Sequence, residues 1–246
     1  MSGTFRIRKY AVLTALVSFL LCSCTDFFST SLASWAARDP ESLIPDVTSD
    51  NVDELIQKTR NDPALSLVVL KRIKSASKNA KGKDLLALQQ ASVQAASNAT
   101  GIASALISQA GNISSINDKD SAISLIESSL SSIKNLVSVA DNLNDIMPDP
   151  VPGDPAWDNF INNTSADDLA IVAVLLLAGE AKKDPDGVED YLENKFKGNP
   201  VTEQEVLAVA LVVEAVNKTD SSGLSDSLKA LVEGLNLWKP PQVLLP

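Results

Sequence analysis

Histidine is absent from the 246 residues, and cysteine occurs only twice, at Cys22 and Cys24. Without histidine the chain cannot assemble a Ser-His-Asp or a Cys-His nucleophile system. Two cysteines and no histidine are also too few for a zinc site or a thiolate-bound metal cluster. We therefore expect no catalysis, no cofactor and no metal ion.

Aromatic side chains are nearly as scarce, with eleven in the chain and none between Trp35 and Trp157. That stretch offers no surface on which sugars or bases could stack, and its core must be built from aliphatic side chains. Basic residues number 21 against 31 acidic ones, so the net charge is −10. A nucleic-acid binder needs clustered lysine and arginine, and we therefore expect no nucleic-acid partner.

The N-terminus has the features of an export signal. Three basic residues precede an apolar run over 11–21 that is too short to cross a bilayer as a helix. The run ends in Leu21-Cys22-Ser23-Cys24, which resembles the lipobox of bacterial lipoproteins. The resemblance implies cleavage of a signal peptide over 1–23 between Ser23 and Cys24, with diacylglycerol and palmitate-type acyl chains on Cys24. An uncleaved signal anchor, or cleavage by ordinary signal peptidase, is the alternative.

Residues 24–48 are predicted to form a tether and docking segment. Phe28, Leu32 and Trp35 share helical spacing, so they either pack on the folded body or lie among lipid headgroups. Residues 24–35, followed by Arg38-Asp39-Pro40, resemble spirochaete envelope lipoproteins. The resemblances imply a location in the bacterial cell envelope, anchored to a membrane by lipid. They leave the inner or outer membrane, and the periplasmic or surface face, open.

The remaining chain is predicted to be all-α. Glycine is rare, and apolar residues recur at intervals of three and four. Four Asp-Pro pairs have the form of helix starts, and Thr164–Asp167 and Thr202–Glu205 have the form of capping boxes. The Asp-Pro pairs begin at Asp39, Asp62, Asp154 and Asp184. The predicted helices cover 50–60, 63–79, 83–110, 118–146, 155–162, 165–182, 185–196, 203–217 and 222–236.

A helical region over 49–147 contains a segment without charge. No charged residue occurs from Leu85 to Asn117. The apolar spacing predicts a long antiparallel hairpin that turns at about 111–117. The missing charge has two explanations: burial by other helices of the chain, or a surface for a protein partner or for self-association.

Residues 148–153 are rich in proline and are predicted to be a linker. The region 154–246 is predicted to contain helical hairpins and an extended tail in which Trp238 fills a surface groove. A weak internal repeat relates Leu169-Ala170 to Leu207-Ala208 at an offset of 38 residues. The fold is therefore either repeat-like, of the tetratricopeptide or HEAT kind, or an irregular helical bundle.

Carboxylates are the only remaining groups with potential chemistry. Asp145, Asp149, Asp154 and Asp158 surround the proline-rich segment and could hold calcium, but the spacing matches no EF-hand, and helix capping explains part of the set. Glu180 ends an apolar run beside Lys182 and Lys183, which predicts an exposed ion pair rather than a buried acid.

These observations predict a lipid-anchored scaffold or partner-binding module. The alternative is a small-ligand or lipid-binding lipoprotein that serves a transporter. That function would need an aliphatic cavity, which the apolar runs 169–178 and 206–216 could line.

Overall fold

The computed structural model describes residues 44–102, 133–188, 190–191 and 202–222, together with the single residues 42 and 130. The chain separates into two units, Met1–Leu43 and Ile44–Pro246. All the helices described below belong to the second unit. Cys24, the lipobox, the docking segment to residue 41, the hairpin turn at 111–117 and the C-terminal tail lie outside the described residues.

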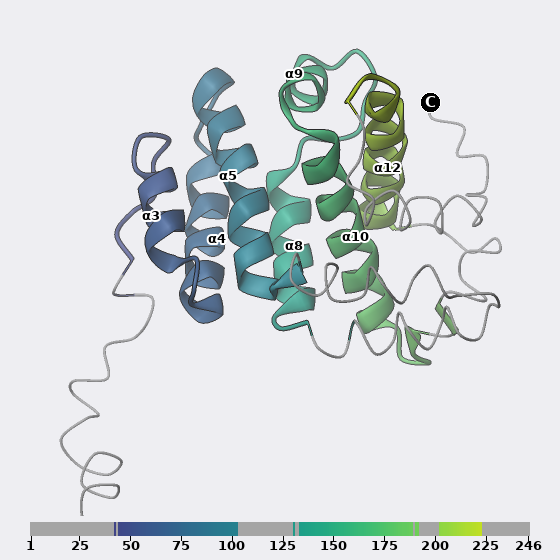
Figure 1. The fold of residues 1–246 in the computed structure, drawn as a ribbon, viewed down its shortest axis with the longest axis horizontal. Helices are drawn as coiled ribbons and strands as arrows, with labels where there is room; N and C mark the ends of the chain where they lie inside the picture. Colours follow the sequence, from purple (N-terminus) through teal and green to yellow (C-terminus); the bar gives the residue numbers. More distant parts are fainter. Residues whose placement is uncertain are drawn as a thin grey trace, which may run out of the picture. The chain divides into compact units, whose positions relative to one another are not determined.

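The described residues form seven helices packed as a bundle, and no strand occurs among them. Figure 1 shows these helices, coloured along the sequence. The predicted all-α class is confirmed. The helices are α3 (Val52–Thr59), α4 (Pro63–Ser77), α5 (Gly82–Thr100), α8 (Leu136–Ile146), α9 (Pro155–Asn163), α10 (Ala166–Lys183) and α12 (Glu203–Ser222).

Helix α5 is the central element of the bundle. It contacts α3, α4, α8, α9 and α10. Helix α8 also packs on α4 and α10, and α12 packs on α10 (Figure 1). The helices therefore associate mainly with neighbours along the chain, while α5 joins the first half of the bundle to the second.

The two described Asp-Pro pairs that precede α4 and α9 act as predicted. Asp62 Oδ1 accepts hydrogen bonds from the amides of Ala64 and Leu65, and Asp154 Oδ1 accepts from Ala156 and Trp157. In each case the proline occupies the first helical turn, where it has no amide to leave unsatisfied.

The other capping predictions have mixed outcomes. Thr202 and Glu205 form a full capping box, in which each side chain accepts a hydrogen bond from the other's amide. The predicted box at Thr164 is wrong by one residue, because Ser165 caps α10 and accepts from the Asp168 amide. Asp184 starts no helix; it begins a turn that Gly187 closes with a φ of 97°. The following helical residues therefore begin at 188, not at 185.

The two long helices predicted over 83–110 and 118–146 are wrong as continuous helices. Helix α5 ends at Gly101, whose φ of 70° is a left-handed conformation that suits glycine. Helix α8 begins only after Asn135, which is also left-handed at a φ of 56°. The two helices still run antiparallel, because Asn135 Nδ2 donates to the carbonyl of Ala99, and Gln89 Nε2 donates to that of Ile146.

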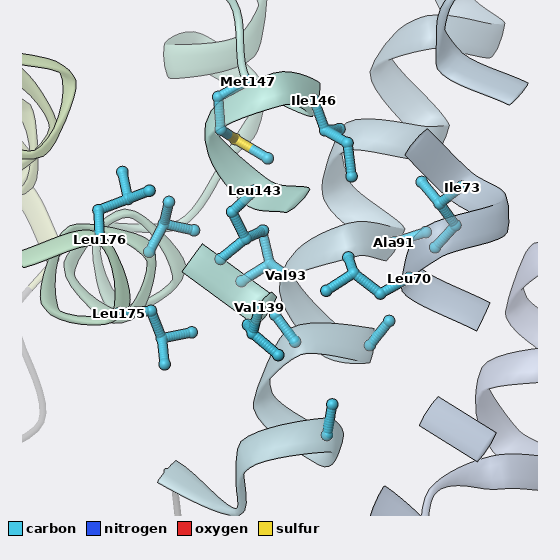
Figure 2. Packing of buried hydrophobic residues seen from close by; sticks show 14 of the residues in the cluster. Leu70, Ile73, Ala91, Val93, Val139, Leu143, Ile146, Met147, Leu175 and Leu176 are labelled. Carbon is cyan, nitrogen blue, oxygen red and sulfur yellow. The ribbon is translucent and has the colours of Figure 1, made fainter. Parts of the chain in front are cut away.

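The described core is aliphatic through the first half of the bundle. Leu70 and Ile73 of α4 belong to the same buried cluster as Ala91 and Val93 of α5 (Figure 2). Side chains from α8 and α10 complete the same cluster, and the labelled members are Val139, Leu143, Ile146, Met147, Leu175 and Leu176. Each fully buried Leu, Ile or Val contributes about 1.5–3 kcal/mol, so many such contacts compensate for the missing aromatic rings.

The proline-rich segment 148–153 does not separate two independent bodies. It connects α8 to α9, and α8 packs against α10 on the far side of the segment. Leu143 and Leu176 belong to one continuous core cluster. The segment therefore connects two helices of the same unit.

The internal repeat is reflected in burial but not in helix geometry. Leu169, Ala170, Leu207 and Ala208 are all buried. The preceding segments differ, because Asp154 caps a helix whereas Asp184 starts a turn. Of the two predicted alternatives, the described residues form the helical bundle.

None of the described helices has both the length and the apolar composition needed to cross a membrane by itself. Helices α9 and α10 satisfy those two criteria only when taken together, and they bend by 115° at the break between them.

Candidate functional site

The described part of the charge-free segment is covered by the chain itself. Between Leu85 and Thr100 only Gln94 is exposed, and the other side chains are buried or half-buried. The polar groups there have partners: Gln89 Nε2 donates to Ile146, Gln90 Nε2 donates to the carbonyl of Asn163, and Ser92 Oγ donates to the carbonyl of Gln89. Burial of this central helix accounts for the missing charge over 85–100. Residues 103–117 lie outside the described residues.

A surface groove lies along the face of α5 that carries the exposed Gln94. A cavity of about 300 Å³ is lined by parts of α3, α5 and the α9–α10 corner. A second cavity, of about 210 Å³, adjoins it and shares Val93, Gln94 and Asp168 with it. We call the two cavities together the α5 groove. The larger cavity is at the lower end of the size range of ligand pockets in proteins.

Neutral amides and hydroxyls dominate the polar lining of the α5 groove. The amides are those of Gln57, Gln90, Gln94, Asn98 and Asn163, and the hydroxyls are those of Ser49, Ser97 and Thr164. The charged groups on its walls are two carboxylates, Asp53 and Asp168, and one guanidinium, Arg60. Such a lining can exchange hydrogen bonds in both directions and carries a small excess of negative charge.

Two groove residues are held in place by the fold. Gln90 Nε2 donates to the carbonyl of Asn163 at 2.6 Å, which ties α5 to the end of α9. Asp168 Oδ2 accepts a hydrogen bond from Ser165 Oγ at 2.7 Å, as part of the cap of α10. Thr164 is only 3% exposed, and its hydroxyl makes no hydrogen bond within the described part of the chain. A buried hydroxyl without a partner costs about 1–3 kcal/mol.

The predicted carboxylate cluster near the proline-rich segment does not gather. Asp145 forms an ion pair with Lys74 of α4, Asp154 caps α9, and Asp158 lies in the first turn of α9. The acidic group that does gather among the described residues is Asp184, Asp186 and Asp190, with carboxylate oxygens within 4.8 Å of one another. This grouping was not predicted from the sequence. The spacing of these aspartates around the 184–187 turn was the available signal.

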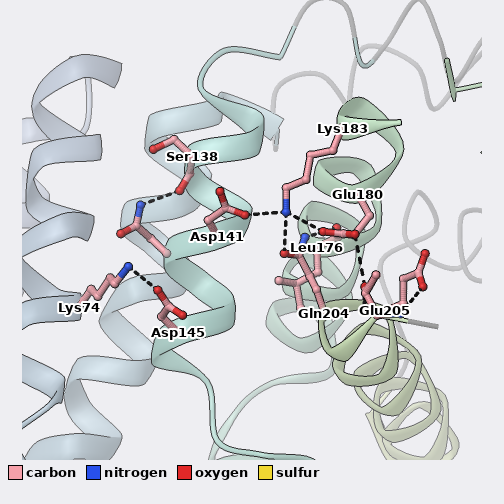
Figure 3. A network of polar contacts seen from close by, with 11 residues as sticks. Lys74, Ser138, Asp141, Asp145, Leu176, Glu180, Lys183, Gln204 and Glu205 are labelled. Atoms are coloured by element: carbon pink, nitrogen blue, oxygen red, sulfur yellow. Dashed lines mark hydrogen bonds and ion pairs between the residues drawn. The ribbon is translucent and has the colours of Figure 1, made fainter. Parts of the chain in front are cut away.

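A polar network joins α8, α10 and α12 (Figure 3). Lys183 Nζ contacts Asp141 Oδ1 at 2.7 Å, Glu180 Oε1 at 2.6 Å and Gln204 Oε1 at 3.3 Å. Burial alone would lower the pKa of Lys183, but the hydrogen bonds and charges of Asp141 and Glu180 outweigh it and raise the pKa. The ion pair predicted at Glu180 is present, although the side chain is only 13% exposed and does not face water as expected.

A second polar contact lies at the start of α12. The Tyr191 hydroxyl donates to Glu205 Oε1 at 2.7 Å, and the amide of Thr202 donates to Glu205 Oε2 at the same distance. Burial, followed by the hydrogen bond and the charge of Glu205, raises the pKa of Tyr191 well above its usual range. Both contacts hold Glu205 in a capping role. The cap was predicted from the sequence, but the contact with the tyrosine, which lies 14 residues away, was not.

Comparison with protein-family models, with curated proteins and with solved structures finds no match for this chain. The function must therefore be inferred from the sequence and the geometry alone.

Proposed function

We propose that the chain is a lipid-anchored cell-envelope protein whose helical bundle acts as a scaffold and binds a protein partner, without catalysis. The observation that carries the proposal is the lipobox Leu21-Cys22-Ser23-Cys24, preceded by a basic segment and a short apolar run. The helical bundle with an open polar groove supports the binding role.

The physical consequences of lipidation suit such a role. Each buried methylene of an acyl chain contributes about 0.8 kcal/mol to membrane binding, and two or more chains together anchor a protein durably. Removal of 1–23 takes away Arg6, Arg8 and Lys9 and no acid, which changes the net charge from −10 to −13. An acidic body of this kind is repelled by anionic headgroups, so it extends from the membrane surface.

The alternative, a lipid or small-ligand carrier for a transporter, receives less support. It would need an aliphatic cavity lined by 169–178 and 206–216. In the described residues those runs pack on each other where α10 meets α12, and Leu175, Leu176 and Leu211 are fully buried there. The α5 groove is instead lined largely by amides and hydroxyls.

Metabolic labelling with a palmitate analogue tests the anchor. The full chain, produced in bacterial cells, should take up label and fractionate with membranes. Cys24→Ser should abolish the label. Cys22→Ser is the matched control and should retain it, since position 22 lies within the signal and accepts a small residue. Label retained in Cys24→Ser, or absent from the unmodified chain, would contradict the proposal.

A further inference from the structure

Three amide side chains follow one another along the groove side of α5. Gln90, Gln94 and Asn98 are spaced by four residues, and each lines the α5 groove. Residues four apart lie on the same face of a helix, about 6 Å apart along its axis. They therefore form a row of amides along the floor of the groove.

The groove is long relative to a compact ligand. Its lining residues on α5 extend from Ala87 in the larger cavity to Asn98 in the smaller one. Eleven steps along a helix span about 16 Å. An extended polypeptide covers the same length with about five residues.

We propose that the α5 groove binds an extended segment of a partner polypeptide, whose main chain hydrogen-bonds to the side chains of Gln94 and Asn98. The inference rests on the proposed partner-binding function and identifies the site and the kind of ligand. Alternate residues of an extended chain repeat every 6.6 to 6.8 Å, roughly the 6 Å spacing of the amides. Each amide offers both donors and an acceptor, as the main chain does.

Gln94 and Asn98 are the two amides of the row for which the described residues provide no partner. Neither side chain makes a hydrogen bond within the part of the chain that the structure describes, and Gln94 is exposed. Gln90, by contrast, is fixed, because its Nε2 donates to the carbonyl of Asn163.

Thr164 lines the larger cavity, and its hydroxyl lacks a hydrogen-bond partner among the described residues. The residue is only 3% exposed, and the hydroxyl oxygen itself is shielded from solvent, so it takes no part in the proposed contacts.

The charges on the walls indicate a basic ligand. Asp53 lines the larger cavity, Asp168 lines both, and Arg60 lines only the smaller one. A lysine or arginine of the bound segment is therefore attracted to the part of the groove between Asp53 and Asp168, away from Arg60.

Selection of a heptapeptide display library on the full chain, purified in detergent, tests the proposal. We expect the selected peptides to contain a lysine or arginine. A scan in which one backbone nitrogen at a time is methylated should weaken binding at alternate positions. The double variant Gln94→Ala/Asn98→Ala should raise the Kd at least about tenfold. Asn217→Ala, an exposed amide on α12 that lines neither cavity, is the matched control and should leave the Kd unchanged.

Thermal unfolding of each variant checks that the fold is retained, and Gln94 is exposed enough for its substitution to be tolerated. The proposal is overturned if no peptide binds, if the double variant binds as tightly as the unmodified chain, or if N-methylation weakens binding without a two-residue period. If a protein partner co-purified equally with the unmodified chain and with Gln94→Ala/Asn98→Ala, the α5 groove would be rejected as the binding site. The proposed partner-binding function would still hold. Failure of the Cys24 label would reject the lipid anchor independently of the peptide result.

Discussion

Gly179 of α10 lies directly against Ala140 of α8. A Cβ atom built on Gly179 would overlap the Cβ of Ala140, and it would also lie 3.2 Å from Gln204 Nε2 of α12. Ala140 is fully buried, and the position of its Cβ is set by the backbone, so relief of the overlap would require the helices to move. The two helices therefore approach each other as closely as they do because position 179 has no side chain.

We predict that Gly179→Ala destabilises the bundle. The higher helix propensity of alanine favours the variant by up to about 1 kcal/mol, but the clash forces α8 and α10 apart. We expect a net loss of about 1–3 kcal/mol, typical of overpacked cores, in urea unfolding. Adding Ala140→Gly should recover part of the loss. Equal stability of Gly179→Ala and the unmodified chain would show that the helices are not in close contact.

Local features of the fold could be predicted from the sequence because their causes are local. Asp62 and Asp154 cap helices through amides two and three residues away, and the adjacent proline makes the pattern specific. The helix breaks at Gly101 and Asn135 were missed because apolar spacing continues across them. Glycine and asparagine are the residues that most readily adopt a left-handed backbone, so the residue types at these two positions were a signal for a helix end. The continuous apolar spacing favoured an unbroken helix instead.

The α5 groove could not be predicted, because its lining combines residues that are distant along the chain. Asp53, Gln94 and Asp168 come from three helices, and only tertiary packing brings them together. The same limit applies to the contact of Tyr191 with Glu205, which depends on the turn at 184–187. The spacing of residues along the sequence predicts which side chains share one face of a helix. It does not predict which other helix packs against that face.

Removal of either aspartate cap should destabilise the bundle. We expect Asp62→Ala and Asp154→Ala each to cost about 0.5–2 kcal/mol in urea unfolding, because two amides lose their acceptor. Asp158→Ala is the control. It removes an acidic residue from the first turn of α9 that is not the cap of the helix. If all three variants lost the same stability, charge near the helix N-terminus would explain the effect and the cap bonds would not.

Tyr191 should resist ionisation while the protein is folded. Its pKa is raised in the fold above the value of about 10 for an exposed phenol. The stability from Tyr191 is therefore fully present below about pH 10 and declines as the pH rises further. Phenolate absorbance in a Tyr10→Phe chain, which keeps Tyr191 as the only tyrosine, should increase only as circular dichroism reports unfolding.

The matched comparison for this prediction is Tyr191→Phe. Its stability should fall less steeply above about pH 10 than that of the chain with Tyr191, since the titrating group is gone. Lysine titration affects both chains and cancels in the comparison. Full phenolate absorbance at pH 10 in a protein with native circular dichroism would contradict the buried hydrogen bond to Glu205.

The two lysines in Figure 3, Lys74 and Lys183, should contribute differently to the free energy of unfolding. Lys74 pairs with the half-exposed Asp145, so Lys74→Met should cost less than about 1 kcal/mol and should cost even less at high salt. Lys183→Met deprives the largely buried Glu180 of its cation, and we expect a loss of about 1–3 kcal/mol. Urea unfolding at low and high salt checks both values. A larger loss for Lys74→Met would contradict the assigned network.

Photocrosslinking from Gln94 in intact membranes tests the central claim most directly. A photoreactive amino acid is placed at position 94 of the full chain, with position 217 on α12 as the control site. Mass spectrometry then identifies the residues joined to it. We expect a polypeptide partner crosslinked from position 94 through a lysine- or arginine-containing segment, no such product from position 217, and loss of the product in Cys24→Ser. The absence of a partner product from position 94, or equal products from both positions, would contradict the account.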